Sequence, residues 1–281
     1  MSDAVQSVFD AVAATAPEIR GALPTRRTAA SGTNPSGETQ LAADVYADRQ
    51  FEARLSGIDA VGTYASEERE EPIDIGGGSL SVAIDPLDGS SNLRSNNSMG
   101  TIVGIYDGSL PAPGRDLVGA CYVLYGPITT MVAATDGTVR EELLDDGERS
   151  LLSDDLRLPE EPTVYGFGGR VPEWDEAFRS YVREIESELK LRYGGAMVGD
   201  VNQVVTYGGI FSYPSVESAP NGKLRALFEA APMGYVVEAA GGASSNGDRS
   251  LLEIGPESLH ERTPVHLGNR SLIDRLEAAL R

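Results

Sequence analysis

The sequence of 281 residues is poor in cysteine and in lysine, with Cys121, Lys190 and Lys223 as the whole supply. A single cysteine excludes an intrachain disulfide and a cysteine-based zinc site. No apolar run reaches membrane-spanning length, and residues 1–4 have neither the basic region nor the apolar core of a signal peptide. We therefore expect a cytoplasmic protein with no membrane partner.

Basic residues as a whole are scarce, 23 against 43 acidic ones, which gives a formal net charge of −20. Such an acidic surface argues against nucleic acid as a partner, because phosphates repel it. The acidic groups also repel one another, and molar salt removes this repulsion by shortening the Debye length to about 3 Å. The composition therefore favours the salt-rich cytosol of a haloarchaeon over the alternative, an ordinary acidic mesophilic enzyme.

Several catalytic motifs are missing as well. The run Gly76-Gly77-Gly78 lacks the spacing of a Walker loop or a Rossmann fingerprint, and no serine or cysteine has the surroundings of a nucleophile elbow. The two histidines, His260 and His266, are typical of loop or surface residues. What remains is carboxylate chemistry, which favours metal-assisted hydrolysis over a covalent enzyme intermediate.

The most informative stretch, residues 85–92, reads Asp-Pro-Leu-Asp-Gly-Ser-Ser-Asn and follows the apolar run 82–84. This run is typical of the end of a buried strand. Two carboxylates at a strand end can hold Mg²⁺, and free N–H groups of a following helix start can hold a phosphate. The alternative is an ordinary surface Asp-Gly turn.

A second acidic group lies upstream, at Ser66-Glu67-Glu68. Glutamate runs are usually solvated. However, two or three Mg²⁺ ions need more oxygen ligands than one octet supplies. Glu67 and Glu68 could then divide the work, one bridging metals and the other orienting a water molecule.

The rest of the chain alternates between helical and strand-like patterns, which predicts a mixed α/β fold with layered sheets and helices. Helices are expected over 2–20, 39–51, 174–189 and 232–240 and from Ser271, and strands over 81–84, 101–106, 117–124 and 128–134. The small-residue segment 29–37 predicts a mobile loop. The acidic segment 145–161 predicts a surface connector.

The octet and Ser66-Glu67-Glu68 resemble class I fructose-1,6-bisphosphatase. Three further stretches, 192–198, 207–214 and 222–229, are similar to that family in order and spacing. The resemblance implies a layered α-β-α-β-α sandwich of the sugar phosphatase superfamily. It also implies Mg²⁺-dependent hydrolysis of the 1-phosphate of fructose 1,6-bisphosphate, with two or more ions per subunit and Mn²⁺ as a substitute. A broader sugar phosphatase or an inositol monophosphatase-like enzyme is the alternative, and a catalytically dead sugar-phosphate sensor is a third reading.

The resemblance also implies a role for each matching residue. The implied metal ligands are Glu67, Asp85, the Leu87 carbonyl, Asp88 and Glu229. Glu68 would activate the attacking water, helped by Glu38 and supported by Asp44. Substrate would be bound by Gly89, Ser90, Ser91, Asn92, Arg192, Tyr193, Met197, Tyr213, Lys223 and Arg225, with Arg192 reaching a neighbouring subunit of a homodimer or homotetramer.

The same resemblance divides the chain into residues 1–160, with most metal ligands and the phosphate loop, and 161–281, with the sugar-phosphate pocket and the last metal carboxylate. Three departures stand out. Glu38 replaces the family's usual loop aspartate, and the family's asparagine and tyrosine for the 6-phosphate are missing near 166–171. Ser79-Leu80 replaces the Lys-Tyr pair of the nucleotide site, so we expect weak or absent inhibition by AMP.

Overall fold

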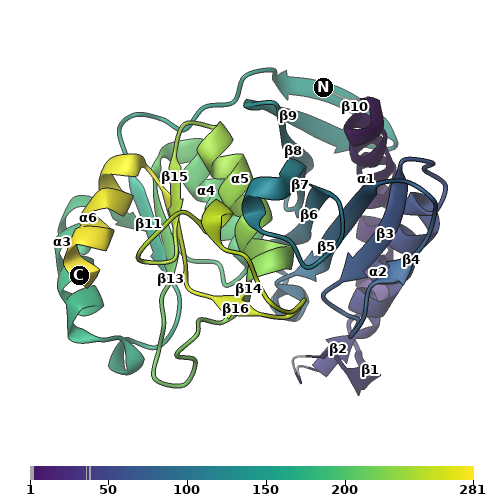
Figure 1. Ribbon diagram of the computed structural model, residues 1–281. Helices are drawn as coiled ribbons and strands as arrows, with labels where there is room; N and C mark the ends of the chain where they lie inside the picture. Colours follow the sequence, from purple (N-terminus) through teal and green to yellow (C-terminus); the bar gives the residue numbers. More distant parts are fainter. Residues whose placement is uncertain (1–2, 36, 38) are drawn as a thin grey trace.

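The computed structural model describes residues 3–35, 37 and 39–281. Helices and sheets alternate in layers across the molecule (Figure 1). From the right of the view, helices α1 (Asp3–Ala22) and α2 (Ala42–Leu55) cover a large sheet, whose other face packs on α4 (Met197–Tyr207) and α5 (Ala231–Ala239). A smaller sheet follows, and α3 (Glu176–Glu188) and α6 (Arg270–Leu280) cover its outer face. The layered sandwich expected from the sequence is confirmed.

The large sheet has the strand order β10-β9-β8-β7-β6-β5-β3-β4. Its strands are β3 (Val61–Ser66), β4 (Ile73–Asp74), β5 (Leu80–Asp88), β6 (Met99–Asp107), β7 (Leu117–Tyr125), β8 (Thr129–Thr135), β9 (Thr138–Asp145) and β10 (Glu148–Ser153). β3 and β5 run parallel, whereas β5 and β6 are antiparallel. Every residue of β5 is buried, as expected of a central strand covered by helices on both faces.

The first helix shows why the sequence folds this way. Val5, Val8, Phe9 and Val12 recur at helical spacing and are all at most 2% exposed, so one stripe of α1 lies against the sheet. The polar residues between them face water.

The smaller sheet has the order β12-β11-β13-β17-β15. It contains β11 (Val164–Phe167), β12 (Lys190–Leu191), β13 (Gly209–Tyr213), β15 (Ala243–Ser245) and β17 (Val265–Gly268). A short pair, β14 (Leu224–Arg225) and β16 (Arg262–Thr263), lies beside it. The chain enters α5 through a single wide turn, η5 (Ala226–Ala230).

The expected helices and strands are present, with three corrections. The segment 29–37 is not a loop throughout, because β1 (Ala29–Thr33) pairs antiparallel with β2 (Thr39–Leu41). This pairing also delays the start of α2 to Ala42. The segment 145–161 is not only a connector, since β10 forms the outer edge of the large sheet, where all but its last residue are exposed.

The third correction concerns the octet. β5 does not end at Ile84 but continues through Asp88, with Asp85 opposite Ile102 and Asp88 opposite Gly100. The register shifts between these two pairs, in the stretch that contains Pro86 and Leu87. Proline cannot donate a ladder hydrogen bond, which accounts for the irregularity there.

Candidate metal and phosphate site

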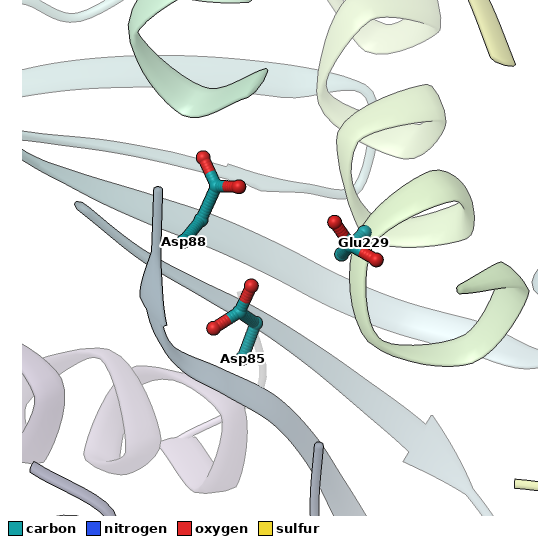
Figure 2. A group of neighbouring side chains, drawn as sticks. All are labelled: Asp85, Asp88 and Glu229. Atoms are coloured by element: carbon teal, nitrogen blue, oxygen red, sulfur yellow. The ribbon is translucent and has the colours of Figure 1, made fainter. Parts of the chain in front are cut away.

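Three carboxylates converge at the end of β5. Figure 2 shows Asp85 and Asp88 on that strand facing Glu229, which lies on η5. One oxygen of each lies within 4.8 Å of the others, and the three residues are 4%, 7% and 2% exposed. Buried oxygens gathered at this separation form the donor set of a hard divalent cation.

Backbone groups hold each carboxylate in place. Leu87 N donates to Asp85 Oδ1 at 2.9 Å, Val198 N donates to Asp88 Oδ2 at 2.7 Å, and Arg225 N donates to Glu229 Oε2 at 2.6 Å. The Val198 N–H belongs to the first turn of α4, where the helix dipole favours an anion. The second half of the chain therefore orients a carboxylate of the first.

The electrostatics of the cluster also suit a cation. Burial raises the pKa of Asp88 to about 7 and the pKa of Glu229 to about 8, with the Glu67 charge adding to both. Burial, followed by the charges of its acidic neighbours, raises the pKa of Asp85 well above its usual range. These carboxylates are costly to ionise together, and a bound cation would offset that cost.

Glu67 reaches the cluster from β3. Because β3 and β5 are parallel and Ser66 pairs with Ile84, Glu67 and Asp85 follow neighbouring positions at the same end of the sheet. Glu67 Oε1 contacts Arg225 Nη2 at 2.7 Å, and both side chains are almost fully buried. Arg225 Nη1 lies 3.7 Å from Glu229 Oε2, so one guanidinium joins acidic residues from both halves of the chain.

Glu68 lies beside Glu67 and contacts the segment before α2. Gln40 Nε2 donates to Glu68 Oε2 at 2.5 Å. Burial, helped by the charges of Asp44 and Glu67, raises the pKa of Glu68 to about 8. Asp44 caps α2, since its Oδ2 accepts from Leu41 N at 2.6 Å. Glu38 lies outside the described residues.

After Asp88 the chain turns sharply at Gly89, whose φ of 73° is left-handed. A Cβ at this position would lie 2.2 Å from the Ala196 Cβ, so glycine permits both the turn and the close approach of the 194–197 segment. The turn leads into the short helix η2 (Ser90–Leu93).

A cavity of about 370 Å³ unites these groups with residues from the second half of the chain. Lys223 Nζ lies 5.8 Å from the centre of the Tyr213 ring inside it. The predicted residues that line the cavity are Asp44, Glu67, Glu68, Asp85, Leu87, Asp88, Gly89, Ser90, Ser91, Tyr193, Met197, Tyr213, Lys223, Arg225 and Glu229.

Two predicted site residues lie apart from this lining. The Asn92 amide is occupied by the carbonyls of Ser98 and Gly194, at 2.8 and 2.9 Å. Arg192 lines a neighbouring hollow of about 240 Å³. Tyr193 lines both spaces, so the two hollows share a wall.

Sequence reasoning missed several lining residues, among them Asn34, Gln40 and Asp200. Asp200 is 4% exposed, and its carboxylate accepts from Gly194 N at 2.5 Å and Gly195 N at 3.1 Å. Burial raises its pKa to about 6. An aspartate in the first turn of a helix that follows a Gly-Gly pair is a signal that could have identified it.

The layered fold and this site together define the class of carboxylate-based phosphatases. Family models described as the N- and C-terminal domains of fructose-1-6-bisphosphatase match residues 4–152 and 158–281. The chain is 61% identical to fructose-1,6-bisphosphatase class 1 of Natronomonas pharaonis, over all of both chains. It is 56% identical to the protein of that name from Halobacterium salinarum, over all of this chain and 98% of the other.

Solved structures agree with the sequence comparisons. The holo form of Leishmania major fructose-1,6-bisphosphatase superposes with a TM-score of 0.94 at 31% identity, covering all of this chain and 95% of that one. The chain therefore belongs to the class 1 fructose-1,6-bisphosphatase family, as its motifs indicated.

Within the described residues, no helix is long and apolar enough to cross a membrane.

Proposed function

We propose that this protein hydrolyses the 1-phosphate of fructose 1,6-bisphosphate, giving fructose 6-phosphate and phosphate, with Mg²⁺ as cofactor. One observation carries the proposal. A buried carboxylate cluster and a lysine lie in the same cavity, with the 89–91 turn between them in sequence. Such a cavity has one end suited to a cation and a phosphoryl group and another suited to a second phosphate.

Asp85, Asp88 and Glu229 would hold the metal, with Glu67 and the Leu87 carbonyl as further ligands. Their all-oxygen donor set suits Mg²⁺ or Mn²⁺ better than zinc. When bound, the metal would polarise the phosphoryl oxygens, stabilise the leaving oxygen and make a water more acidic. Without metal, Arg225 neutralises the charge of Glu67. With metal and substrate bound, Arg225 would face the phosphate.

Glu68 would orient the attacking water and accept its proton. The Gln40 amide fixes this carboxylate at 2.5 Å, and Asp44 contributes negative charge nearby. A carboxylate held by one neutral donor in a buried position is a suitable general base. Glu38, which precedes α2 in the sequence as Gln40 does, would assist Glu68.

The substrate would lie between the two ends. Backbone N–H groups and hydroxyls of Gly89, Ser90 and Ser91 would bind the 1-phosphate, since successive N–H groups in a left-handed turn bind anions. Tyr193, Met197 and Tyr213 would contact the sugar. Lys223 would bind the 6-phosphate as a compact point charge. Asn92 would act by positioning the loop.

Arg192 would complete the 6-phosphate site of a neighbouring subunit, so the proposal includes a homodimer or homotetramer. It also assigns most metal ligands and the phosphate loop to residues 1–160, and the sugar pocket to 161–281. A cytoplasmic, salt-rich setting belongs to the same proposal. The haloarchaeal relatives and the net charge of −20 support the salt-rich setting.

The test is phosphate release from fructose 1,6-bisphosphate, fructose 6-phosphate and inositol 1-phosphate, each with Mg²⁺, Mn²⁺ or EDTA, at low and at molar KCl. We expect strong preference for the bisphosphate, loss of activity in EDTA, and a collapse of activity at low salt that Mg²⁺ does not restore. Comparable rates on all three substrates would favour a broader sugar phosphatase. Activity that persists in EDTA would contradict the metal assignment.

A further inference from the structure

A third cavity, of about 310 Å³, lies where the C-terminal end of α1 meets the segment after η2. Arg20 and Arg27 line one side of it, and Asn96 and Asn97 line another. Leu93 and Met99, both buried, contribute apolar surface. Its lining differs from that of the carboxylate cavity, because the described lining residues include no aspartate or glutamate.

The two arginines lack carboxylate partners in a chain whose acidic residues outnumber its basic ones by 43 to 23. Most of its other arginines lie beside a carboxylate, as Arg69 does beside Asp48 and Arg275 beside Glu188. Within the described part of the chain, neither Arg20 nor Arg27 has a carboxylate within 4.0 Å.

Neutral oxygens hold both guanidinium groups instead. Arg20 Nη1 donates to Thr129 Oγ1 at 2.7 Å, and its Nη2 lies 3.4 Å from the Pro127 carbonyl. Arg27 Nη2 donates to the Arg94 carbonyl at 3.0 Å. These contacts orient the groups without cancelling their charge, and each guanidinium keeps further N–H donors for a ligand.

We propose that this cavity is a binding site for a small multivalent anion, a phosphate ester or a polycarboxylate, separate from the reaction site. Two oriented guanidinium groups provide paired donors in the geometry that phosphate and carboxylate oxygens accept. The two asparagine amides at the wall can add neutral donors. Leu93 and Met99 provide an apolar surface that the apolar part of such a ligand can contact.

The position of the cavity places a bound anion next to the reaction site. Leu93 is the last residue of η2, which begins at Ser90 of the proposed phosphate loop. Asn97 Nδ2 donates to the Gly194 carbonyl at 2.9 Å, so this wall also contacts the turn that precedes α4. An anion bound here would therefore act on two segments of the reaction site without entering it.

The proposal can be tested by equilibrium dialysis of inorganic phosphate against the full-length, Mg²⁺-loaded protein in constant molar KCl. We expect the wild type to bind one phosphate in this cavity in addition to the phosphates that the reaction cavity binds. In the double variant Arg20→Gln/Arg27→Gln, this additional phosphate should bind about tenfold more weakly or worse, since charge-assisted bonds to both guanidinium groups are lost. Arg249→Gln, which changes an exposed arginine paired with Asp248, is the matched control and should bind as many phosphates as the wild type.

Arg27→Gln alone keeps the contacts of Arg20 with Thr129 and Pro127, so it serves if the double variant fails to fold. It should weaken the same phosphate severalfold. Equal binding by wild type, Arg27→Gln and the double variant would overturn the proposal. So would a double variant that binds phosphate normally but changes oligomeric state in sedimentation, because the arginines would then meet a second copy of the chain. The readout is binding alone, so its failure would leave the proposed hydrolysis untouched.

Discussion

The side-chain amide of Asn92 donates a hydrogen bond of 2.9 Å to the carbonyl oxygen of Gly194. The same carbonyl accepts from Asn97, also at 2.9 Å, and Asn92 donates in addition to the Ser98 carbonyl at 2.8 Å. Asp200 holds the N–H groups of Gly194 and Gly195 from the other side. The last residue of the octet therefore fixes the turn on which Tyr193 is presented.

Replacing Asn92 by alanine should raise KM for fructose 1,6-bisphosphate about tenfold, since the Gly194 turn loses a donor that orients it. Affinity for Mg²⁺ should change little, because Asn92 does not contact the carboxylate cluster. Steady-state kinetics with a Mg²⁺ titration measures both. Asn97→Ala removes the other donor to the same carbonyl and should have a smaller effect, because Asn92 also holds Ser98. If Asn92→Ala lost Mg²⁺ affinity by the same factor as its KM rises, the idea that Asn92 acts on substrate binding and not on metal binding would be refuted.

Asp88→Asn should lower kcat by at least about 10³-fold, because the amide removes a charged ligand from the cation site. The folded state should survive, since an amide oxygen can still accept from Val198 N. Without metal, its melting temperature should equal or exceed that of the wild type, because a buried charge is removed. Turnover and thermal unfolding in EDTA test both parts. An Asp88→Asn protein with normal turnover would show that Asp88 does not hold the metal.

Gly89→Ala should destabilise the protein by about 2–5 kcal/mol, the sum of left-handed strain and the contact with Ala196. Gly137→Ala is a matched control. Gly137 has nearly the same φ, 72° against 73°, yet nothing lies within 4 Å of the Cβ it would gain. This control should lose only about 1–2 kcal/mol. Denaturant unfolding measures the difference in stability between the two variants. Equal losses of stability would mean that the segment carrying Ala196 moves away from the new Cβ at no cost.

Acid stability should depend on His266, which lies buried in β17 and not in a loop or at the surface as its sequence context indicated; it is 1% exposed and its ring lies 6.3 Å from Phe178. Burial lowers its pKa to about 3 in the folded state, against about 6.5 in an unfolded chain. Between these values the unfolded chain binds a proton that the folded chain does not. His266 therefore has no effect on stability above pH 6.5 and reduces it progressively as the pH falls toward 3.

In His266→Gln this contribution should vanish, which removes a slope of up to about 1.4 kcal/mol per pH unit from the acid limb. Urea unfolding between pH 4 and 8 measures the slope. His260→Gln, the change of the other histidine, should leave it in place. An unchanged slope in His266→Gln would show that this ring is protonated within the fold.

Much of the site was predictable because its residues are local in sequence. The octet places two carboxylates, a left-handed glycine and two serines within eight positions, and one strand end carries them all. Glu67 could be identified as a candidate ligand because it comes directly after an apolar, strand-like segment. By contrast, Glu229 has no local signal, since a lone glutamate after Ala226-Leu227-Phe228 looks like any helical residue. Only resemblance to a family assigned it.

The missed features depend on contacts and exposure that none of the local sequence patterns above identified. Gln40 lies in the site because β2 pairs with β1. The small residues of 29–33 do not predict this pairing. Asp200 matters because it accepts the N–H groups of Gly194 and Gly195 across a turn. The edge strand β10 was missed because nearly all of its residues are exposed, and a strand exposed on both faces lacks the alternation that marks a half-buried strand.

The central helical layer has a consequence for the order of events in the cell. Helices α4 and α5 are packed between the two sheets. The N–H of Val198 in α4 orients Asp88, and Glu229 lies immediately before α5. A chain still emerging from the ribosome therefore has its octet long before it has a site. Glu229, the last of the proposed metal ligands, is made only after residues 1–228, so we expect a chain that stops before it to lack phosphatase activity.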